Sequence, residues 1–271
     1  MKKYPIGFNV NMPENKSDMC EVNNECVDTA RKSLVRIYFP ARNMTLSYYN
    51  DLFDLHCGDM VYVDGKLEGL KGQVVEVNYT FKIKLSDYHK VIAVADTKVK
   101  GDFYIANSHL ITFDENTIPY EKVRSWFLMP ENDDDYVFGE DGGDVFPLDN
   151  LNKMNIQPQI AERGNDYYID NKVLYISLCG TSGKAIVEGS EFYEVDFEYT
   201  DGEISNLVCS CFCAGACKHE FAAMLQLREC LDVIEKEYCD KHTDYFAVIS
   251  KAVFVNTVLA SKCTGKINID F

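Results

Sequence analysis

The segment that decides the fold runs from residue 203 to residue 219 and reads EISNLVCSCFCAGACKH. In an extended strand, side chains two residues apart share a face, so Cys209 and Cys211 present both sulfurs to one side. After a short glycine-containing turn, Cys217 and His219 fall at the start of a predicted helix, where backbone N–H groups and the helix dipole favour thiolate over thiol. The four side chains therefore predict a metal site where a strand meets a helix.

Three thiolates and one imidazole form a ligand set for zinc, which closes all four tetrahedral positions at structural sites. Because no position is left for water, the pattern predicts one structural Zn²⁺ per chain, held by Cys209, Cys211, Cys217 and His219, and no catalytic metal. One alternative stays open, in which Cys213 replaces Cys209 and only three residues reverse the chain between the two ligand pairs. We favour the first set.

The composition of the chain argues against a membrane protein and against tight binding to nucleic acid. Its 271 residues carry 43 Asp and Glu against 27 Lys and Arg, and the resulting net charge of −16 opposes binding to phosphate backbones. The N-terminus has a basic start but no apolar core segment, and no stretch approaches the roughly 18 apolar residues of a membrane span. A cysteine cluster without a secretion signal indicates metal binding in a reducing compartment, so we expect a cytoplasmic protein.

An N-terminal unit of short strands is predicted over residues 33–129. The alternation of apolar and polar residues from 74 to 83, with Asp64-Gly65 as a turn, is typical of a β-meander. About five short strands in such a length form a small β-barrel or a bent antiparallel sheet. Residues 1–32 are polar and rich in Asn and show no sustained period, which predicts a mobile arm.

An acidic linker is predicted over residues 130–154. Its segment from 130 to 149, PENDDDYVFGEDGGDVFPLD, holds eight acids and no Lys or Arg. Proline, glycine and mutually repelling carboxylates bury too little apolar surface to order such a segment. We therefore expect an extended connection between two domains.

A C-terminal unit with a zinc-stabilised β-hairpin and helix (ββα) is predicted over residues 155–271. The alternating stretch FYEVDFEY, residues 192–199, indicates a strand with one wet face, and the turn Thr200-Asp201-Gly202 leads into a returning strand. From Lys218 to about Tyr238, apolar residues recur at intervals of three and four, as in an amphipathic helix. The tail after this helix fits either a second helix or strands. Strands and helix together predict an α+β fold.

The order C-x-C, a short spacer and C-x-H resembles the ligand pattern of the SWIM-type zinc finger. Upstream, IAERGNDYYIDNKVLYISL (160–178) and KAIVEGSEFYEVDFEY (184–199) resemble the lead-in of these domains in bacterial proteins, and CKHEFAAMLQL (217–227) resembles their helix. The similarity covers about residues 158–232. The spacer is short here and carries the surplus Cys213, which bears on the ligand set and not on the presence of a metal site.

The resemblance implies a structural zinc ion in a ββα unit and a role in binding DNA or other proteins. Family members occur beside Swi/Snf-type ATPases, in Mutator-type transposases, in recombination-accessory proteins and in ubiquitin-ligase-like proteins. The expectation is therefore a non-enzymatic interaction module that mediates protein–protein contacts, including contacts within a DNA-associated complex. A Swi/Snf-type ATPase or a recombination factor is the kind of partner that the resemblance implies.

The N-terminal unit supports an alternative function, that of a nucleic-acid-binding accessory protein. The segment FDLHCGDMVYVDGKLEGLKGQVVEV (53–77) resembles small barrels of nucleic-acid-associated and ribosome-associated proteins, including the KOW type and the 3′-end-binding barrel of primosomal helicases. Residues 1–129 carry nearly equal numbers of acids and bases, so this unit suits phosphates better than the acidic C-terminal unit. The candidate side chains are Arg31, Lys32, Arg36, Arg42, Lys82 and Lys84 for phosphates, and Tyr48, Tyr49 and Phe81 for stacking on bases.

Two cysteines outside the cluster have the elements of a thiol nucleophile with a base. Cys57 follows His56 directly, and Cys179 would need a histidine from a distant part of the chain. Neighbouring residues on a strand point to opposite faces, and neither cysteine lies in a nucleophile motif. We therefore expect a protein that is not an enzyme.

Overall fold

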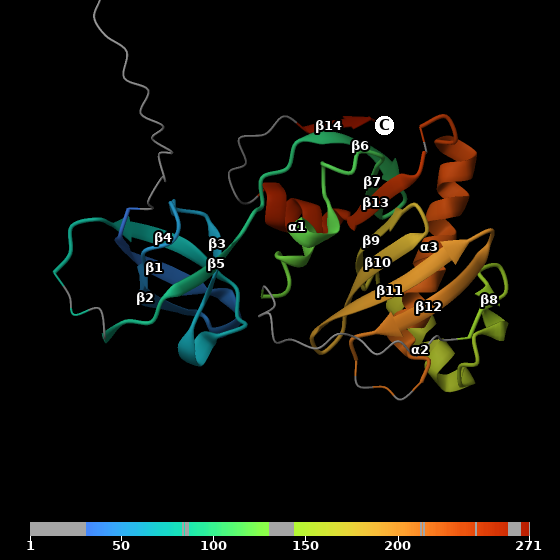
Figure 1. The fold of residues 1–271 in the computed structure, drawn as a ribbon, viewed down its shortest axis with the longest axis horizontal. Helices are drawn as coiled ribbons and strands as arrows, with labels where there is room; N and C mark the ends of the chain where they lie inside the picture. The colour runs from blue at the N-terminus through green and yellow to red at the C-terminus, as the bar shows by residue number, and fades with distance from the viewer. Residues whose placement is uncertain are drawn as a thin grey trace, which may run out of the picture.

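The structure is a computed structural model in which two β-sheets lie side by side, with the longer helices packed on the larger sheet (Figure 1). Helices together with antiparallel sheets confirm the predicted α+β class. The described residues are 31–82, 84, 87–129, 144–211, 213, 215–241, 243–259 and 267–270. Residues 1–30 of the predicted arm and residues 130–143 of the predicted linker lie outside this part of the chain.

The five-stranded sheet, called the small sheet, has the strand order β2-β1-β4-β3-β5 with antiparallel ladders. A parallel bridge between Tyr49 and Lys90 joins its two edge strands, and there the Tyr49 N–H donates to the His89 carbonyl at 2.9 Å. The small sheet therefore bends until it closes on itself at this end. Its strands are β1 (Ser33–Phe39), β2 (Met44–Asn50), β3 (Met60–Val63), β4 (Gly72–Asn78) and β5 (Val91–Ala95).

The small sheet encloses an apolar cluster of its own. Val35, Ile37 and Phe39 alternate along β1 and are 0% exposed, because every second side chain of a strand points to the same face. Gly72 of β4 allows close packing here, since a Cβ at this position would lie 2.3 Å from Ile37 Cγ2. All buried members of the cluster fall between residues 35 and 91, so this core is local in sequence.

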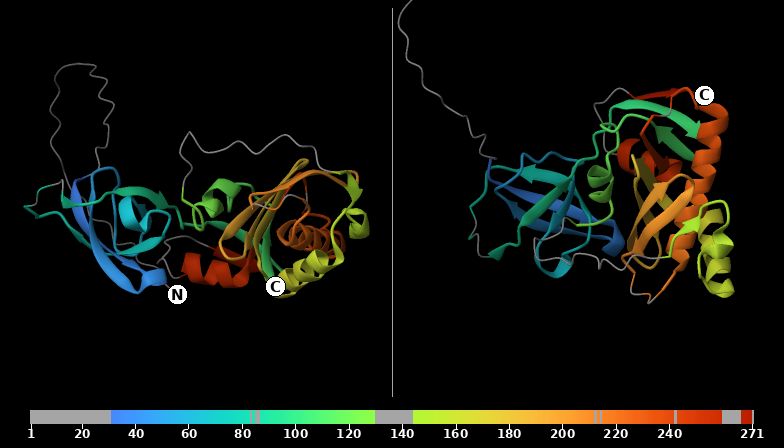
Figure 2. Two further views of the ribbon diagram at one scale, coloured as in Figure 1. Left: turned by 90° about the horizontal axis from the view of Figure 1, so that it is seen from below. Right: turned by 45° about the vertical axis from the view of Figure 1, so that its right-hand side comes forward.

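The nine-stranded sheet, called the large sheet, has the order β14-β6-β7-β13-β9-β10-β11-β12-β8 and is antiparallel except where β14 pairs with β6. Helices α2 and α3 cover one of its faces (Figures 1 and 2) and share a core cluster with it. Its strands are β6 (Gly101–Ala106), β7 (His109–Thr112), β8 (Phe146–Pro147), β9 (Val173–Cys179), β10 (Ser182–Glu188), β11 (Phe192–Thr200), β12 (Glu203–Cys209), β13 (Tyr245–Ser250) and β14 (Ile267–Asp270). The α-helices are α1 (Tyr120–Arg124), α2 (Pro158–Ile169), α3 (Lys218–Glu237) and α4 (Lys251–Phe254).

The C-terminal tail contributes an inner strand of the large sheet. All six residues of β13 are buried, and the strand pairs with β7 on one side and β9 on the other. A strand that is covered on both faces has a continuous run of apolar residues without alternation. For this reason the sequence of the tail did not distinguish a helix from a strand. The short helix α4 follows directly, so the tail contains both kinds of element.

The strands divide the chain earlier than the predicted boundary at residue 129. The small sheet ends at Ala95, whereas β6 and β7 pair within the large sheet, because β7 finds its second partner in β13 from the tail. Residues 144–154 also depart from the predicted extended linker. Their apolar side chains are buried and join the core cluster of the large sheet; these are Phe146, Leu148, Leu151 and Met154.

The two sheets meet through the segment that follows α1. Trp126 is 0% exposed, and its Nε1–H donates to the Asp96 carbonyl at 2.8 Å. From the small sheet, the Tyr62 hydroxyl donates to the Ser125 carbonyl at 3.1 Å, and Lys71 Nζ donates to the Trp126 carbonyl at 2.5 Å. These bonds fix the small sheet against the large one. Within the described residues, no helix combines the length and the apolar character required to cross a membrane.

Candidate metal centre

The hairpin of β11 and β12 brings the first two cysteines to one end of the large sheet. Asp201 and Gly202 form its turn with φ angles of 51° and 85°, the left-handed conformations that a type I′ turn requires. β12 ends at Cys209, and Cys211 follows two residues later. The strand thus delivers both thiols to the same corner, as the two-residue spacing predicts.

Helix α3 brings the other two candidate ligands. Cys217 is its N-cap, with the Cys217 N–H donating to Glu220 Oε2 at 2.8 Å and the Glu220 N–H donating to Cys217 Sγ at 3.4 Å. This reciprocal pair is a capping box in which a cysteine stands in the place of the usual Ser or Thr. The same thiol therefore starts the helix and faces the cluster. His219 follows in the first turn of α3 and is 3% exposed.

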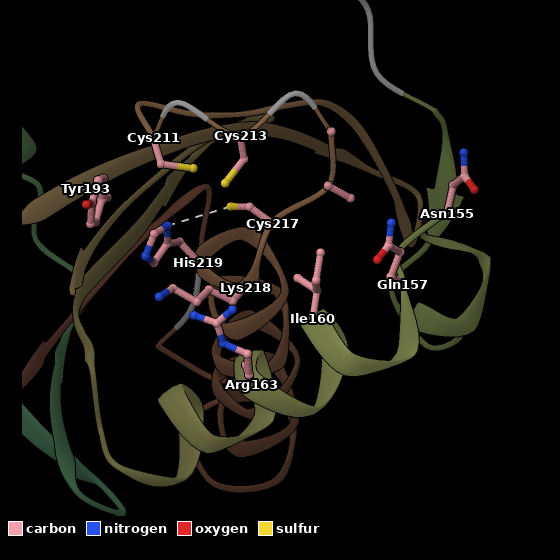
Figure 3. A pocket seen from close by; sticks show the side chains of 12 residues that line it. Asn155, Gln157, Ile160, Arg163, Tyr193, Cys211, Cys213, Cys217, Lys218 and His219 are labelled. Carbon is pink, nitrogen blue, oxygen red and sulfur yellow. Dashed lines mark hydrogen bonds between the residues drawn. The ribbon is translucent and has the colours of Figure 1, made fainter. Parts of the chain in front are cut away.

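The structure brings all four predicted residues together. The candidate ligand atoms of Cys209, Cys211, Cys217 and His219 lie within 4.8 Å of one another, so the group could hold a metal ion. The sulfurs of Cys209 and Cys217 each lie 3.7 Å from His219 Nδ1, which identifies Nδ1 as the nitrogen that faces the sulfurs (Figure 3). Ligands bound at about 2.0–2.3 Å to a tetrahedral ion lie roughly 3.3–3.8 Å apart, so these spacings fit one ion.

Two tyrosines hold the imidazole of His219 in place. Tyr193 of β11 stacks on the ring with centroids 4.1 Å apart and an interplanar angle of 19°, and Tyr167 of α2 meets it edge-on at 5.5 Å. The contacts restrain the ring with Nδ1 toward the sulfurs, and the other ring nitrogen, Nε2, is buried with no hydrogen-bond partner among the described residues. Sequence reasoning assigned no such role to either tyrosine, because the contact depends on how β11, α2 and α3 pack.

Shared protons dominate the electrostatics of the three thiols. The hydrogen bond with Cys209 lowers the pKa of Cys217 to about 4, and the same contact raises the pKa of Cys209 far above its usual value. Burial raises the pKa of Cys211 to about 12. Because thiols must lose their protons to bind a metal ion, metal binding at this cluster should depend on pH.

The alternative ligand Cys213 lies beside the cluster. Its side chain is exposed, and Figure 3 shows its sulfur directed toward Cys217. It is not a member of the group whose ligand atoms lie within 4.8 Å of one another. The geometry thus favours the set with Cys209.

Part of the surface that the alternative function requires is buried or engaged within the protein, whereas Lys32, Arg42, Lys82 and Lys84 are exposed. Tyr48 and Tyr49 are 4% and 1% exposed, so neither ring is free to stack on a base. Arg36 pairs with Glu76 at 3.1 Å, and the guanidinium of Arg31 lies 4.3 Å above the Tyr79 ring. Two of the predicted phosphate contacts are therefore engaged within the protein.

The two thiols considered as nucleophiles lie far from the cluster in sequence and are exposed. Cys57 donates its thiol hydrogen to the Val75 carbonyl at 3.4 Å, and Cys179 lies at the end of β9. In the described ranges, no recorded hydrogen bond joins either of them to a histidine.

No family model matches the chain, and searches of curated proteins and of solved structures found no match to it either.

Proposed function

We propose that Cys209, Cys211, Cys217 and His219 bind one zinc ion per chain and that this ion is structural. The observation that carries the proposal is the meeting of four ligand atoms within 4.8 Å at the junction of β12 and α3. Three sulfurs and one imidazole suit zinc, whereas calcium and magnesium take oxygen ligands. Four protein ligands complete a tetrahedron and leave no position for a catalytic water.

The zinc ion would stabilise a ββα unit formed by β11, β12 and α3. Cys217 is already the N-cap of α3, so a metal ion at its sulfur ties the first turn of the helix to the end of β12. The pattern and order of the ligands are similar to those of the SWIM-type zinc finger, and we assign the unit to this type. Its spacer of five residues between Cys211 and Cys217 is short, which keeps the strand and the helix close together.

The whole chain then acts as a non-enzymatic interaction module in the cytoplasm. Its net charge of −16 favours a protein partner over a nucleic-acid backbone, and the burial of Tyr48 and Tyr49 points the same way. The resemblance suggests a Swi/Snf-type ATPase or a recombination factor as the partner. A protein contact of this kind needs a rigid surface. We propose that the junction of β12 and α3, which carries the four ligands and is called the metal corner, supplies this surface.

Fluorescence anisotropy tests this function against nucleic-acid binding. Labelled single-stranded and duplex oligonucleotides are titrated with zinc-loaded protein at about 50 mM salt, where phosphate contacts are strong. We expect no binding to either probe. Salt-sensitive binding that Arg42→Gln weakens would overturn the protein-partner proposal and support a nucleic-acid-binding role for the small sheet.

A further inference from the structure

A pocket of about 700 Å³ opens beside the metal centre, between the first half of α2 and the corner that carries the four ligands (Figure 3). We call it the α2–α3 pocket. Cys211, Cys217 and His219 belong to its lining, so the metal corner forms one wall. Arg163 of α2 and Lys218 of α3 form part of the opposite side, and Figure 3 shows them next to each other below the cluster.

The charge of the α2–α3 pocket differs from that of the chain as a whole. Among the described residues that line it there is no Asp or Glu, although the chain has a net charge of −16. Arg163 is exposed, and none of the ion pairs in the described part of the chain involves its guanidinium. The Lys218 ammonium lies 4.5 Å from the centroid of the Tyr167 ring, which restrains its position without neutralising it.

Two helices begin at the pocket, and the N-terminus of α2 strengthens its positive potential. Gln157 precedes the first residue of α2, Cys217 precedes the first residue of α3, and both line the pocket. The N-terminus of a helix carries about half a positive charge, because the first N–H groups have no partner within the helix. The Gln157 side chain forms no capping hydrogen bond with α2. The N-terminus of α2 therefore acts with Arg163 and Lys218 in attracting an anion, whereas the N-terminus of α3 already has the Cys217 sulfur and the Glu220 carboxylate as partners.

The other lining side chains narrow the kind of anion. Ile160 and Ala216 offer apolar surface, and Asn155 offers an amide group for hydrogen bonds with a peptide backbone. A guanidinium binds a carboxylate through two parallel hydrogen bonds. A long polyphosphate chain fits poorly, since the phosphates that extend beyond the pocket would meet an acidic protein. A carboxylate next to an apolar side chain, on a single peptide, matches every part of this lining.

We propose that the α2–α3 pocket binds an Asp or Glu side chain in a peptide segment of a partner protein. The inference rests on the proposed interaction function and specifies which surface meets the partner and which charge the partner brings. Arg163 is the residue that holds the carboxylate, with Lys218 beside it. The metal ion keeps the wall of the pocket in place by fixing the start of α3.

Peptide titration tests the proposal on the full, zinc-loaded chain. The probe is a fluorescein-labelled peptide with a single Glu next to Leu among uncharged residues, and the control probe has Gln in place of that Glu. The test variant is Arg163→Gln, and the matched control is Arg42→Gln, which makes the same charge change on the small sheet. At about 0.1 M salt, charges more than roughly 10 Å apart are screened, so a distant substitution has little effect on binding.

We expect the Glu peptide to bind and the Gln peptide to bind at least about tenfold more weakly, since a charge-assisted hydrogen bond contributes about 1.5–3 kcal/mol. Arg163→Gln should lower the affinity for the Glu peptide by a similar factor and leave the zinc content unchanged, whereas Arg42→Gln should leave both unchanged. Equal binding of the two peptides, or equal effects of the two substitutions, would overturn the pocket assignment.

The zinc content separates failure of this inference from failure of the proposed function. Wild-type protein that holds one zinc ion but ignores the Glu peptide refutes the pocket and leaves the metal site intact. Arg163→Gln protein that loses zinc while its loaded fraction still binds the peptide shows that the arginine serves the thiolates instead, which also refutes the pocket. Wild-type protein without zinc refutes the proposed function itself.

Discussion

The small sheet draws its strands from residues 33–95 in one continuous run, whereas the large sheet joins strands from residues 101–270 in an interleaved order. The first is held by one apolar cluster, and its recorded ion pairs lie near the surface. The second contains the four-residue group that could hold a metal ion and a part-buried ion pair between Arg124 and Glu194, 70 residues apart. The comparison teaches that the long-range assembly of the large sheet combines apolar burial with polar contacts and brings together a group that could hold a metal ion.

The largest difference between the sheets should follow from loss of a metal ligand. Cys217→Ser removes a ligand while keeping a residue that can cap α3, and structural zinc contributes about 10–16 kcal/mol in zinc-finger peptides, comparable with the stability of a whole domain. We expect rapid hydrogen exchange in β11, β12 and α3, with the protection of β1 and β4 preserved. Cys213→Ser is the control and should keep both regions protected. Equal loss of protection in the two sheets would show that the stability of the large sheet depends on the metal ligands no more than that of the small sheet.

The part-buried ion pair should give the next largest effect. Arg124 Nε lies 2.7 Å from Glu194 Oε1, the Tyr120 hydroxyl donates to the same carboxylate, and the two charged side chains are only 12% and 14% exposed. Glu194→Gln removes the carboxylate that pairs with this poorly solvated guanidinium, which should lower the free energy of unfolding by about 3 kcal/mol. Urea unfolding at fixed zinc concentration measures this change.

The matched control is the ion pair of the small sheet. Arg36 and Glu76 are both more than half exposed, at 56% and 55%. Glu76→Gln should therefore change the free energy of unfolding by no more than about 0.5 kcal/mol, because solvent screens an exposed pair. Similar costs for the two Glu→Gln substitutions would remove the distinction between the sheets.

A smaller effect is expected from the core of the small sheet. Ile37→Val removes one buried methyl group beside Phe39 and Gly72 and should cost about 1 kcal/mol. Since the change lies outside the large sheet, the number of zinc ions per chain should stay the same. Thermal unfolding together with metal analysis checks both statements, and a fall in zinc content would contradict the second.

The smallest expected effect is a dependence on pH that comes from His109 of β7. The residue is 1% exposed, and burial lowers its pKa below the ordinary value of 6.5, mainly by disfavouring the charged ring. Below pH 6.5 the unfolded chain binds a proton that the folded chain does not, so the free energy of unfolding falls as the pH decreases from 6.5 toward the folded pKa. Above pH 6.5 this loss disappears.

Urea unfolding of the large sheet between pH 5 and pH 8 measures this dependence, since this range spans the ordinary pKa of histidine. The variant His109→Gln should flatten the slope below pH 6.5, and the exposed His89 of the small sheet serves as the control position. An unchanged slope in His109→Gln would assign the dependence to other groups.

The metal corner could be predicted from the sequence because its signals are local. Within each ligand pair, one residue separates the two ligands, and the Asp201-Gly202 turn has a strong residue preference. The spacing of apolar residues predicts the end of α3 to within one residue of its observed end at Glu237. Each of these signals acts within about one turn or one strand, where periodicity and turn chemistry decide the backbone.

The assembly of the large sheet could not be predicted in this way. The prediction assigned β6 and β7 to the N-terminal unit, but they belong to the large sheet. Nothing in their own sequence identifies β13, more than a hundred residues later, as the strand that pairs with β7. The pairing of Arg124 with Glu194 and the stacking of Tyr193 on His219 likewise depend on which elements pack together. The periodicity of apolar residues predicts the type of an element and its buried face, but it does not predict which distant segment packs on that face.

Cobalt substitution tests the central claim most directly. Protein prepared without metal is titrated with Co²⁺ and followed by visible absorption, which responds to tetrahedral geometry and to sulfur ligands, and zinc is then added to displace the cobalt. We predict saturation at one Co²⁺ per chain with the bands of a tetrahedral three-sulfur, one-nitrogen site, their loss in Cys209→Ser and Cys217→Ser, and their retention in Cys213→Ser. Retention of the bands in Cys209→Ser together with their loss in Cys213→Ser would contradict the ligand set, and a spectrum without tetrahedral bands would contradict the metal site.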